Sequence, residues 1–281
     1  MNSTQPLSEA QVAQFYQDGY LLLPNYFDAE EMEMLLSTAS SDREMLEHSV
    51  NVEDVAGKKS KLSLWNHPGE DIYGMIARSN RVVGGVEQLL GGEVYHYHSK
   101  MMLKEPLVGG AWEWHQDYGY WYQNGCLFPD MVSCLIAVDR ATKENGCLQV
   151  LRGSHKMGRV QHGRFGEQTG ADPERVEQAM KRLELVYCEM EPGTALFFHG
   201  NTLHASAPNT SPNPRWSLIC CYNKATNDPY KESHHPRYTP LVKVDDEAIK
   251  RVGAVGSHGN NSFMRAEEDS TTGAGKEAPK A

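Results

Sequence analysis

The sequence predicts a mainly β protein, with a double-stranded β-helix (jelly-roll or cupin-like) core and flanking helices. Helical patterns occupy most of the first forty residues and residues 70–90, and short apolar or alternating runs follow from Val94 onward. Gly, Pro and Asn separate these runs, as is typical of strands joined by turns. Short strands after a helical segment favour a sandwich or jelly roll with helices packed outside it. The expected strands cover residues 94–104, 131–138, 147–151, 185–190, 194–199 and 216–222.

The helical segment begins with two recognisable caps. Ser8 and Gln11 have the spacing of a capping box, which predicts a helix that begins at this point. A short strand is expected at residues 20–23, before a proline. Asp28 is a suitable N-cap for a second helix. Residues 70–90 carry further apolar positions at helical spacing and end in a Gly-Gly pair, which favours a helix stop.

We expect a single domain over residues 1–264. Asn145-Gly146 lies between two strand-like runs and is the best hairpin signal in the chain. Residues 156–184 interrupt the strands, contain one expected helix over 173–183, and have the length of a lid or binding loop. Residues 265–281 are polar and rich in Gly, Ala and Lys, so we expect a disordered C-terminal tail.

Composition excludes several classes of protein. The 281 residues contain 27 Lys and Arg against 37 Asp and Glu, and the net charge of −10 argues against nucleic-acid or anionic-membrane partners. No apolar run approaches the roughly 20 residues of a membrane span, and the first residues lack the features of a signal peptide. The six cysteines show no CxxC spacing, which predicts reduced thiols without a zinc site or disulfides. We therefore expect a cytoplasmic protein; the sequence carries no signal for an oligomeric state.

The segment His115-Gln116-Asp117 is the strongest chemical signal. On an extended segment, side chains at i and i+2 share a face, so an imidazole and a carboxylate point to one spot. These are two of the three ligands in the 2-His-1-carboxylate triad that holds non-haem Fe(II). Two downstream histidines, His199 and His204, could supply the third ligand.

Several segments resemble the phytanoyl-CoA dioxygenase superfamily of Fe(II)/2-oxoglutarate oxygenases over most of residues 10–225. They are DGYLLLPNYF, WHQD, ENGCLQVLRGSHK, and LHAS followed by Arg215 eleven residues after its histidine. The resemblance implies that His115, Asp117 and His204 bind Fe(II), while His199 is structural or supports a ligand. It also implies that 2-oxoglutarate and O2 are co-substrates. Hydroxylation of the substrate would then be coupled to the conversion of 2-oxoglutarate to succinate and CO2. Family members that halogenate lack the carboxylate, so Asp117 indicates hydroxylation.

Arg215 and Ser217 are the candidates for anchoring 2-oxoglutarate. A buried arginine at the head of a strand can hold a carboxylate through a bidentate, charge-assisted pair. Ser217 lies two residues on, on the same face, and can add a hydroxyl hydrogen bond. Lys100 is a further candidate for contact with the co-substrate. Lys104 could be structural, contact the insertion, or touch 2-oxoglutarate.

Four residues are candidates for the substrate pocket: His98, Tyr118, Tyr120 and Trp121. Trp121 falls where the ectoine hydroxylases of the superfamily place a substrate-facing tryptophan. His98-Ser99-Lys100 falls where they carry Gln-Ser-Arg, and this departure indicates a substrate other than ectoine. Aromatic rings suit a quaternary ammonium group, whereas Lys100 suits a phosphonate or carboxylate. We therefore expect a small zwitterionic metabolite.

Other functions compete with this interpretation. The substrate could be a lipid, a CoA thioester or a natural product. A metal-dependent cupin that does not use 2-oxoglutarate would keep the fold, but such sites usually need more histidines. A metal- or sugar-binding jelly roll without activity would leave Arg215 without a task.

Overall fold

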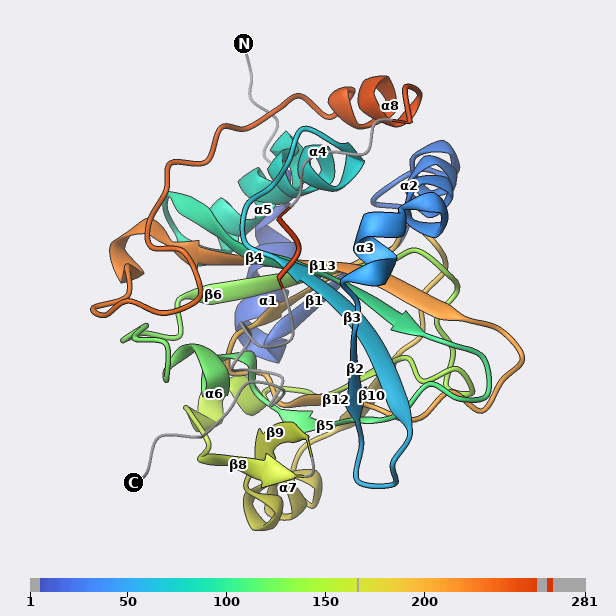
Figure 1. The fold of residues 1–281 in the computed structure, drawn as a ribbon. Coiled ribbons are helices and arrows are strands. Elements are labelled where there is room, and N and C mark those ends of the chain that lie inside the picture. The colour runs from blue at the N-terminus through green and yellow to red at the C-terminus, as the bar shows by residue number, and fades with distance from the viewer. Residues whose placement is uncertain (1–5, 166, 257–261, 265–281) are drawn as a thin grey trace.

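The computed structural model describes residues 6–165, 167–256 and 262–264. A seven-stranded sheet crosses the molecule, with helices on one side of it and a four-stranded sheet on the other (Figure 1). Every neighbouring pair of strands in both sheets is antiparallel. In spatial order the larger sheet contains β1 (Tyr20–Leu23), β11 (Ala195–His199), β6 (Met131–Ala137), β13 (Arg215–Lys224), β4 (Val94–Lys104), β3 (Lys59–Trp65) and β2 (Val50–Glu53).

The smaller sheet carries the segments that matter most for function. It consists of β10 (Leu185–Cys188), β7 (Leu148–Leu151), β12 (His204–Ser206) and β5 (Trp112–His115), in that order. A separate hairpin of β8 (His162–Phe165) and β9 (Gln168–Ala171) lies beside it. The helices are α1 (Glu9–Asp18), α2 (Ala29–Ser41), α3 (Arg43–Glu47), α4 (Ile72–Arg78), α5 (Asn80–Leu90), α6 (Asp117–Trp121), α7 (Pro173–Met180) and α8 (Ala248–Gly253).

Alternation along the central strands creates two hydrophobic cores. On β6, Val132, Cys134 and Ile136 pack into the core beneath the helices. Leu135 and Ala137 face the opposite way, into the core between the two sheets. Side chains that project into the space between the sheets are therefore enclosed from both directions. The predicted mainly β architecture with flanking helices is confirmed.

The caps predicted at the N-terminus are present. Ser8 Oγ accepts a hydrogen bond from the Gln11 backbone at 3.3 Å, and the Gln11 side chain accepts one from the Ser8 backbone at 2.8 Å. Asp28 forms the equivalent box with Glu31 at the start of α2. Gly19 ends α1 at φ 82°, in the left-handed region that glycine adopts without a steric penalty.

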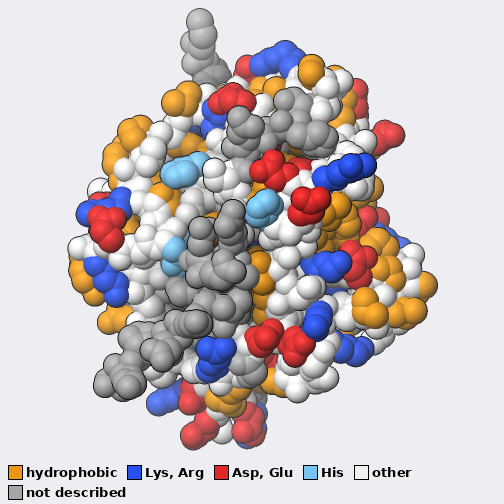
Figure 2. Space-filling view, viewed as in Figure 1, with side chains coloured by type: hydrophobic (Ala, Val, Ile, Leu, Met, Phe, Trp, Pro, Cys, Tyr) orange, Lys and Arg blue, Asp and Glu red, His pale blue; other side chains and the backbone are white. Residues whose placement is uncertain are grey.

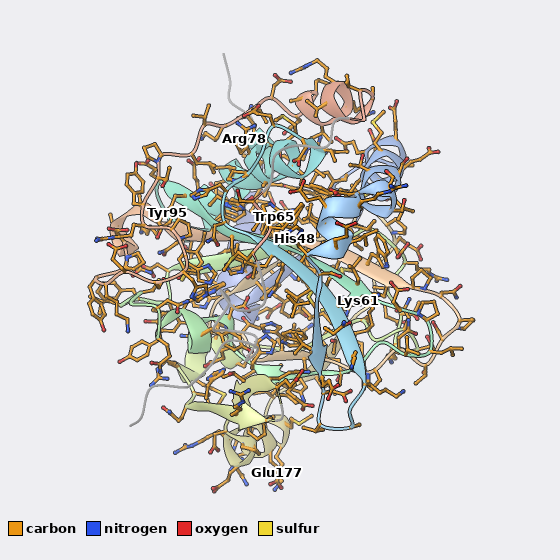
Figure 3. All side chains as sticks on the ribbon, in the orientation of Figure 1. His48, Lys61, Trp65, Arg78, Tyr95 and Glu177 are labelled. Atoms are coloured by element: carbon orange, nitrogen blue, oxygen red, sulfur yellow. The ribbon has the colours of Figure 1, made fainter. Side chains whose placement is uncertain are left out.

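The helical layer and the insertion lie at opposite poles of the molecule. Trp65, at the end of β3, packs against Tyr73 of α4 with ring centroids 5.5 Å apart, beneath the helices (Figure 3). Glu177 of α7 marks the other pole. The predicted insertion thus contains the β8–β9 hairpin as well as its expected helix, which ends at Met180.

One expectation was wrong, and another concerns residues that the structure does not describe. The hairpin at Asn145-Gly146 does not form, because β6 and β7 belong to different sheets. The Asn145 side chain accepts a hydrogen bond from the Thr142 backbone at 2.7 Å and donates one to the Arg140 carbonyl at 2.8 Å. These bonds stabilise a turn that carries the chain from the larger sheet to the smaller one. The tail at 265–281 lies outside the described residues. All six cysteines are free and buried.

On the face in Figure 2, Lys and Arg side chains are interspersed with Asp and Glu. Among the described helices, none combines the length and apolar character that crossing a bilayer demands.

A buried tyrosine joins the helical layer to the large sheet and provides a test of this architecture. The Tyr222 hydroxyl donates to the Ala77 carbonyl at 2.6 Å, and both residues are buried. Tyr222→Phe should lower the free energy of unfolding by about 1–3 kcal/mol, because the carbonyl is stranded away from water. Tyr16→Phe is the matched control, since exposed Tyr16 donates to the Leu89 carbonyl at 2.7 Å and water can replace it. Equal effects in urea unfolding would contradict the prediction.

Candidate metal centre

Three buried side chains converge between the sheets. His115 ends β5 and His204 begins β12, and the two residues are direct register partners in the small sheet. Asp117 Oδ1 lies 3.7 Å from His115 Nε2 and 3.8 Å from His204 Nε2. The three candidate ligand atoms all lie within 4.8 Å of one another. Two imidazoles and a carboxylate at these separations fit a single ion of the non-haem iron type.

The structure changes one detail of the predicted His-x-Asp step. The strand ends at His115, and Asp117 is the first residue of the short helix α6. Gln116 between them is extended, with φ −113° and ψ 134°, so the two side chains still point the same way. The following Tyr118 amide donates to the Gly200 carbonyl at 2.9 Å, which fixes the turn out of the strand.

Backbone carbonyls orient both imidazole rings. His115 Nδ1 lies 2.7 Å from the Glu113 carbonyl, and His204 Nδ1 lies 2.9 Å from the Thr202 carbonyl. A carbonyl only accepts, so each Nδ1 carries the proton and each Nε2 presents its lone pair to the centre. Burial lowers the pKa of His204 to about 3, which keeps that ring neutral and available as a ligand.

The Asp117 carboxylate is ionised and held in one orientation. Burial opposes its charge, but Lys100 and the two histidines hold the pKa of Asp117 well below its usual range. The Ser133 hydroxyl on β6 donates to Asp117 Oδ2 at 2.6 Å, leaving Oδ1 directed to the histidines. Sequence reasoning missed Ser133. Its signal is a lone hydroxyl in the apolar run MVSCLIA.

The insertion is fastened to the turn that carries the ligands. The Gln116 amide nitrogen donates to the carbonyls of Gly158 and Asn201, both at 2.8 Å, and its oxygen accepts from the Val160 backbone at 2.7 Å. The Gln116 backbone also donates to His162 Nε2 at 2.9 Å. His162 Nδ1 lies 2.8 Å from the Val160 carbonyl. Four hydrogen bonds of Gln116 thus hold residues 158–162 and the segment around Asn201 against the centre.

Two cavities meet at this centre and share Lys100 and Trp112. One runs to Arg215 and includes His115, His204 and Ser206, with apolar walls from Met102, Leu135, Leu148, Phe198 and Ile219. The other includes Asp117 and is lined by Leu62, Leu64, His98, Tyr120 and Trp121.

Arg215 is a buried cation with spare hydrogen-bonding capacity. Its side chain donates to Ser217 Oγ at 3.0 Å, while its Nε finds no acceptor in the part of the chain that the structure describes. Burial lowers the pKa of Arg215 to about 10, so the guanidinium still carries its charge at neutral pH. A buried guanidinium is costly without a counter-ion, and a carboxylate in the cavity would supply one.

The predicted substrate residues divide into two groups. His98, Tyr120 and Trp121 line the second cavity together with Lys100. Tyr118 does not: its hydroxyl donates to the Leu127 carbonyl at 2.6 Å, because α6 turns this side chain away from the cavity.

His199 packs beside His155, with ring centroids 5.5 Å apart, and is not part of the cluster of candidate ligands. Ser206 lines the cavity of Arg215 and was not predicted, although it belongs to the segment LHAS.

Comparison with known proteins identifies the family. The phytanoyl-CoA dioxygenase (PhyH) family model matches residues 15–217. L-proline trans-4-hydroxylase of Streptomyces griseoviridis is 31% identical over 271 residues, covering 89% of this chain and 100% of that protein. Ectoine dioxygenase of Stutzerimonas stutzeri is 26% identical over 244 residues, covering 79% and 78%.

The fold agrees with solved structures of related proteins. EctD from S. alaskensis with bound Fe is 25% identical, with a TM-score of 0.67, and the match covers 83% of this chain and 82% of that one. The predicted double-stranded β-helix core is thereby confirmed. The chain belongs to the phytanoyl-CoA dioxygenase family of Fe(II)/2-oxoglutarate-dependent oxygenases.

Proposed function

We propose that this enzyme hydroxylates an unactivated C–H bond of a small polar metabolite, using Fe(II), 2-oxoglutarate and O2 and releasing succinate and CO2. The observation that carries the proposal is a cluster of three ligand-type side chains, two of which, His115 and His204, line the same cavity as buried Arg215. A cupin that does not use 2-oxoglutarate would leave this buried guanidinium without a counter-ion.

The metal ligands in this proposal are His115, Asp117 and His204. Iron bound by such a triad keeps coordination positions open, at which a co-substrate and O2 can react. The chain supplies two imidazoles and one oriented carboxylate, and the surrounding core excludes bulk water. Ser133 would fix the carboxylate through its second oxygen.

Arg215 and Ser217 would bind the distal carboxylate of 2-oxoglutarate. The buried guanidinium lines the same cavity as His115 and His204, and its hydrogen bond to Ser217 fixes its orientation. The apolar walls of this cavity suit the methylene groups of the co-substrate. Lys100 borders both cavities and could meet either the co-substrate or the substrate.

The substrate would occupy the second cavity, next to Asp117. His98, Tyr120 and Trp121 provide an aromatic wall, and Lys100 has no hydrogen-bond or ion-pair partner among the described residues. An aromatic wall with one available cation suits a small molecule that carries an anionic and a cationic group. The relatives named for L-proline and ectoine support a substrate of this size.

Removing the carboxylate ligand tests the metal site. Asp117→Ala should abolish substrate hydroxylation and coupled succinate release, because the centre loses its only anionic ligand. Both products can be followed by mass spectrometry. Asp172→Ala, which removes the N-cap of α7 in the insertion, is a control that should retain turnover. Substrate hydroxylation by the Asp117 variant would reject this ligand assignment.

The hydrogen bond from Ser133 can be tested against an equally buried serine. Ser133→Ala should weaken Fe(II) affinity by about 10- to 100-fold, the usual effect of losing a partner that orients a ligand. Ser63→Ala removes a comparable buried bond, from Ser63 Oγ to the Met45 carbonyl at 2.7 Å, remote from the centre. Anaerobic titration should show a change in the first variant alone. Equal affinities would remove Ser133 from the proposal.

The anchor for the co-substrate is tested by Arg215→Ala. The KM for 2-oxoglutarate should rise by about tenfold to a hundredfold, since hydrogen bonds to charged groups contribute about 1.5–3 kcal/mol. Arg140→Ala, at an exposed ion pair with Glu191, should leave that KM unchanged. An unaltered KM in the Arg215 variant would move the anchor elsewhere, with Lys100 the next candidate.

A further inference from the structure

Lys104 is a second buried cation next to Arg215. It lies on β4 with 1% of its surface exposed, and its register partner on β13 is Arg215 itself. Residues directly opposite on neighbouring strands share a face, and like charges in such a pair destabilise a sheet. Over the described ranges, neither side chain has an ion pair with a carboxylate. The fold therefore holds two adjacent buried cations with no counter-ion of its own.

The surroundings of Lys104 are shaped to accept its side chain. Its Nζ donates to Ser206 Oγ at 2.8 Å and to the Ala207 carbonyl at 2.5 Å, at the end of β12. A Cβ at Gly146 would lie 3.1 Å from this Nζ and would collide with the Ala207 carbonyl. A Cβ at Gly109 would collide with the Lys104 side chain. Two glycines thus leave the space that the lysine fills.

These contacts determine which way the Ser206 hydroxyl points. An ammonium group has donors only, so Ser206 Oγ must accept from Lys104 and its own hydrogen must point elsewhere. Ser206 borders the cavity that ends at Arg215, and its hydroxyl meets no acceptor among the residues described. Burial and the Arg215 guanidinium hold the pKa of Lys104 well below its usual range. An anion bound next to Lys104 and Arg215 would stabilise the ammonium form of Lys104.

We propose that Lys104 is a positioning residue of the co-substrate site. It turns the Ser206 hydroxyl into a donor for the distal carboxylate that Arg215 binds, and it places a second positive charge behind that carboxylate. The proposal rests on the proposed function, because it requires 2-oxoglutarate in this cavity. The competing explanation is structural, in which Lys104 only ties β4 to the end of β12.

Two keto acids separate these explanations. 2-Oxopentanoate has the same carbon chain as 2-oxoglutarate but lacks the distal carboxylate. We would measure the dissociation constants of both for the Fe(II)-loaded enzyme without oxygen, in the wild type and in Lys104→Met. The constant for 2-oxoglutarate should rise at least tenfold, whereas that for 2-oxopentanoate should change less than about twofold. Equal effects on the two, or no effect on either, would overturn the proposal.

Further variants keep the test decisive. Lys156→Met is the matched control, since Lys156 donates to the Gln17 carbonyl at 2.7 Å away from the cavity, and it should bind both keto acids normally. If Lys104→Met does not fold, Lys104→Gln retains a donor without the charge and should show a smaller loss for 2-oxoglutarate alone.

The role of Ser206 is tested separately. Ser206→Ala should weaken 2-oxoglutarate binding, and its effect with Lys104→Met should be less than additive, as expected for residues that act through one contact. Normal binding in Ser206→Ala, or full additivity, would contradict the role assigned to Ser206. Absence of 2-oxoglutarate binding in the wild type would instead reject the proposed function.

Discussion

The register between β5 and β12 is the constraint on which the candidate centre depends. It places His204 directly opposite His115, and a slip of one residue would send one imidazole to the other face of the sheet. In each case the carbonyl two residues before the histidine accepts from its Nδ1, so local backbone geometry also fixes the ring. Asp117 reaches the same point because Gln116 stays extended before the chain turns into α6.

The charge of the interior differs from that of the whole chain. The protein carries a net charge of −10, yet Lys100 and Arg215 line a space whose only carboxylate is Asp117 among the lining residues described. Lys104 lies directly behind this space, where it donates to Ser206. The neighbouring histidine, His204, is held neutral by burial. Buried cations without partners are costly to a fold, and they are retained where a bound anion completes them. Such an interior favours small anionic ligands irrespective of the acidic surface.

Sequence patterns predicted the parts of this molecule that local chemistry determines. Apolar runs located β4 over its full length, and capping residues located α1 and α2. Strand β3 was missed because exposed Lys59 and Lys61 interrupt its apolar positions, and the edge strand β2 is only four residues long. The Asn145-Gly146 turn carries a hairpin signal, but the choice of sheet depends on distant strands. Contacts such as Ser133 with Asp117 join residues far apart in sequence, and no local pattern encodes them.

The hydrogen bonds between Gln116 and the insertion limit how the insertion can move. The same residue lies between two of the candidate ligands and holds residues 158–162 through its side chain and its backbone. If residues 158–162 moved away from the centre, their hydrogen bonds to Gln116 would break, and the segment that carries His115 and Asp117 would lose this support. Admission of substrate by that route would therefore disturb two of the candidate metal ligands, so this edge is expected to stay closed during turnover.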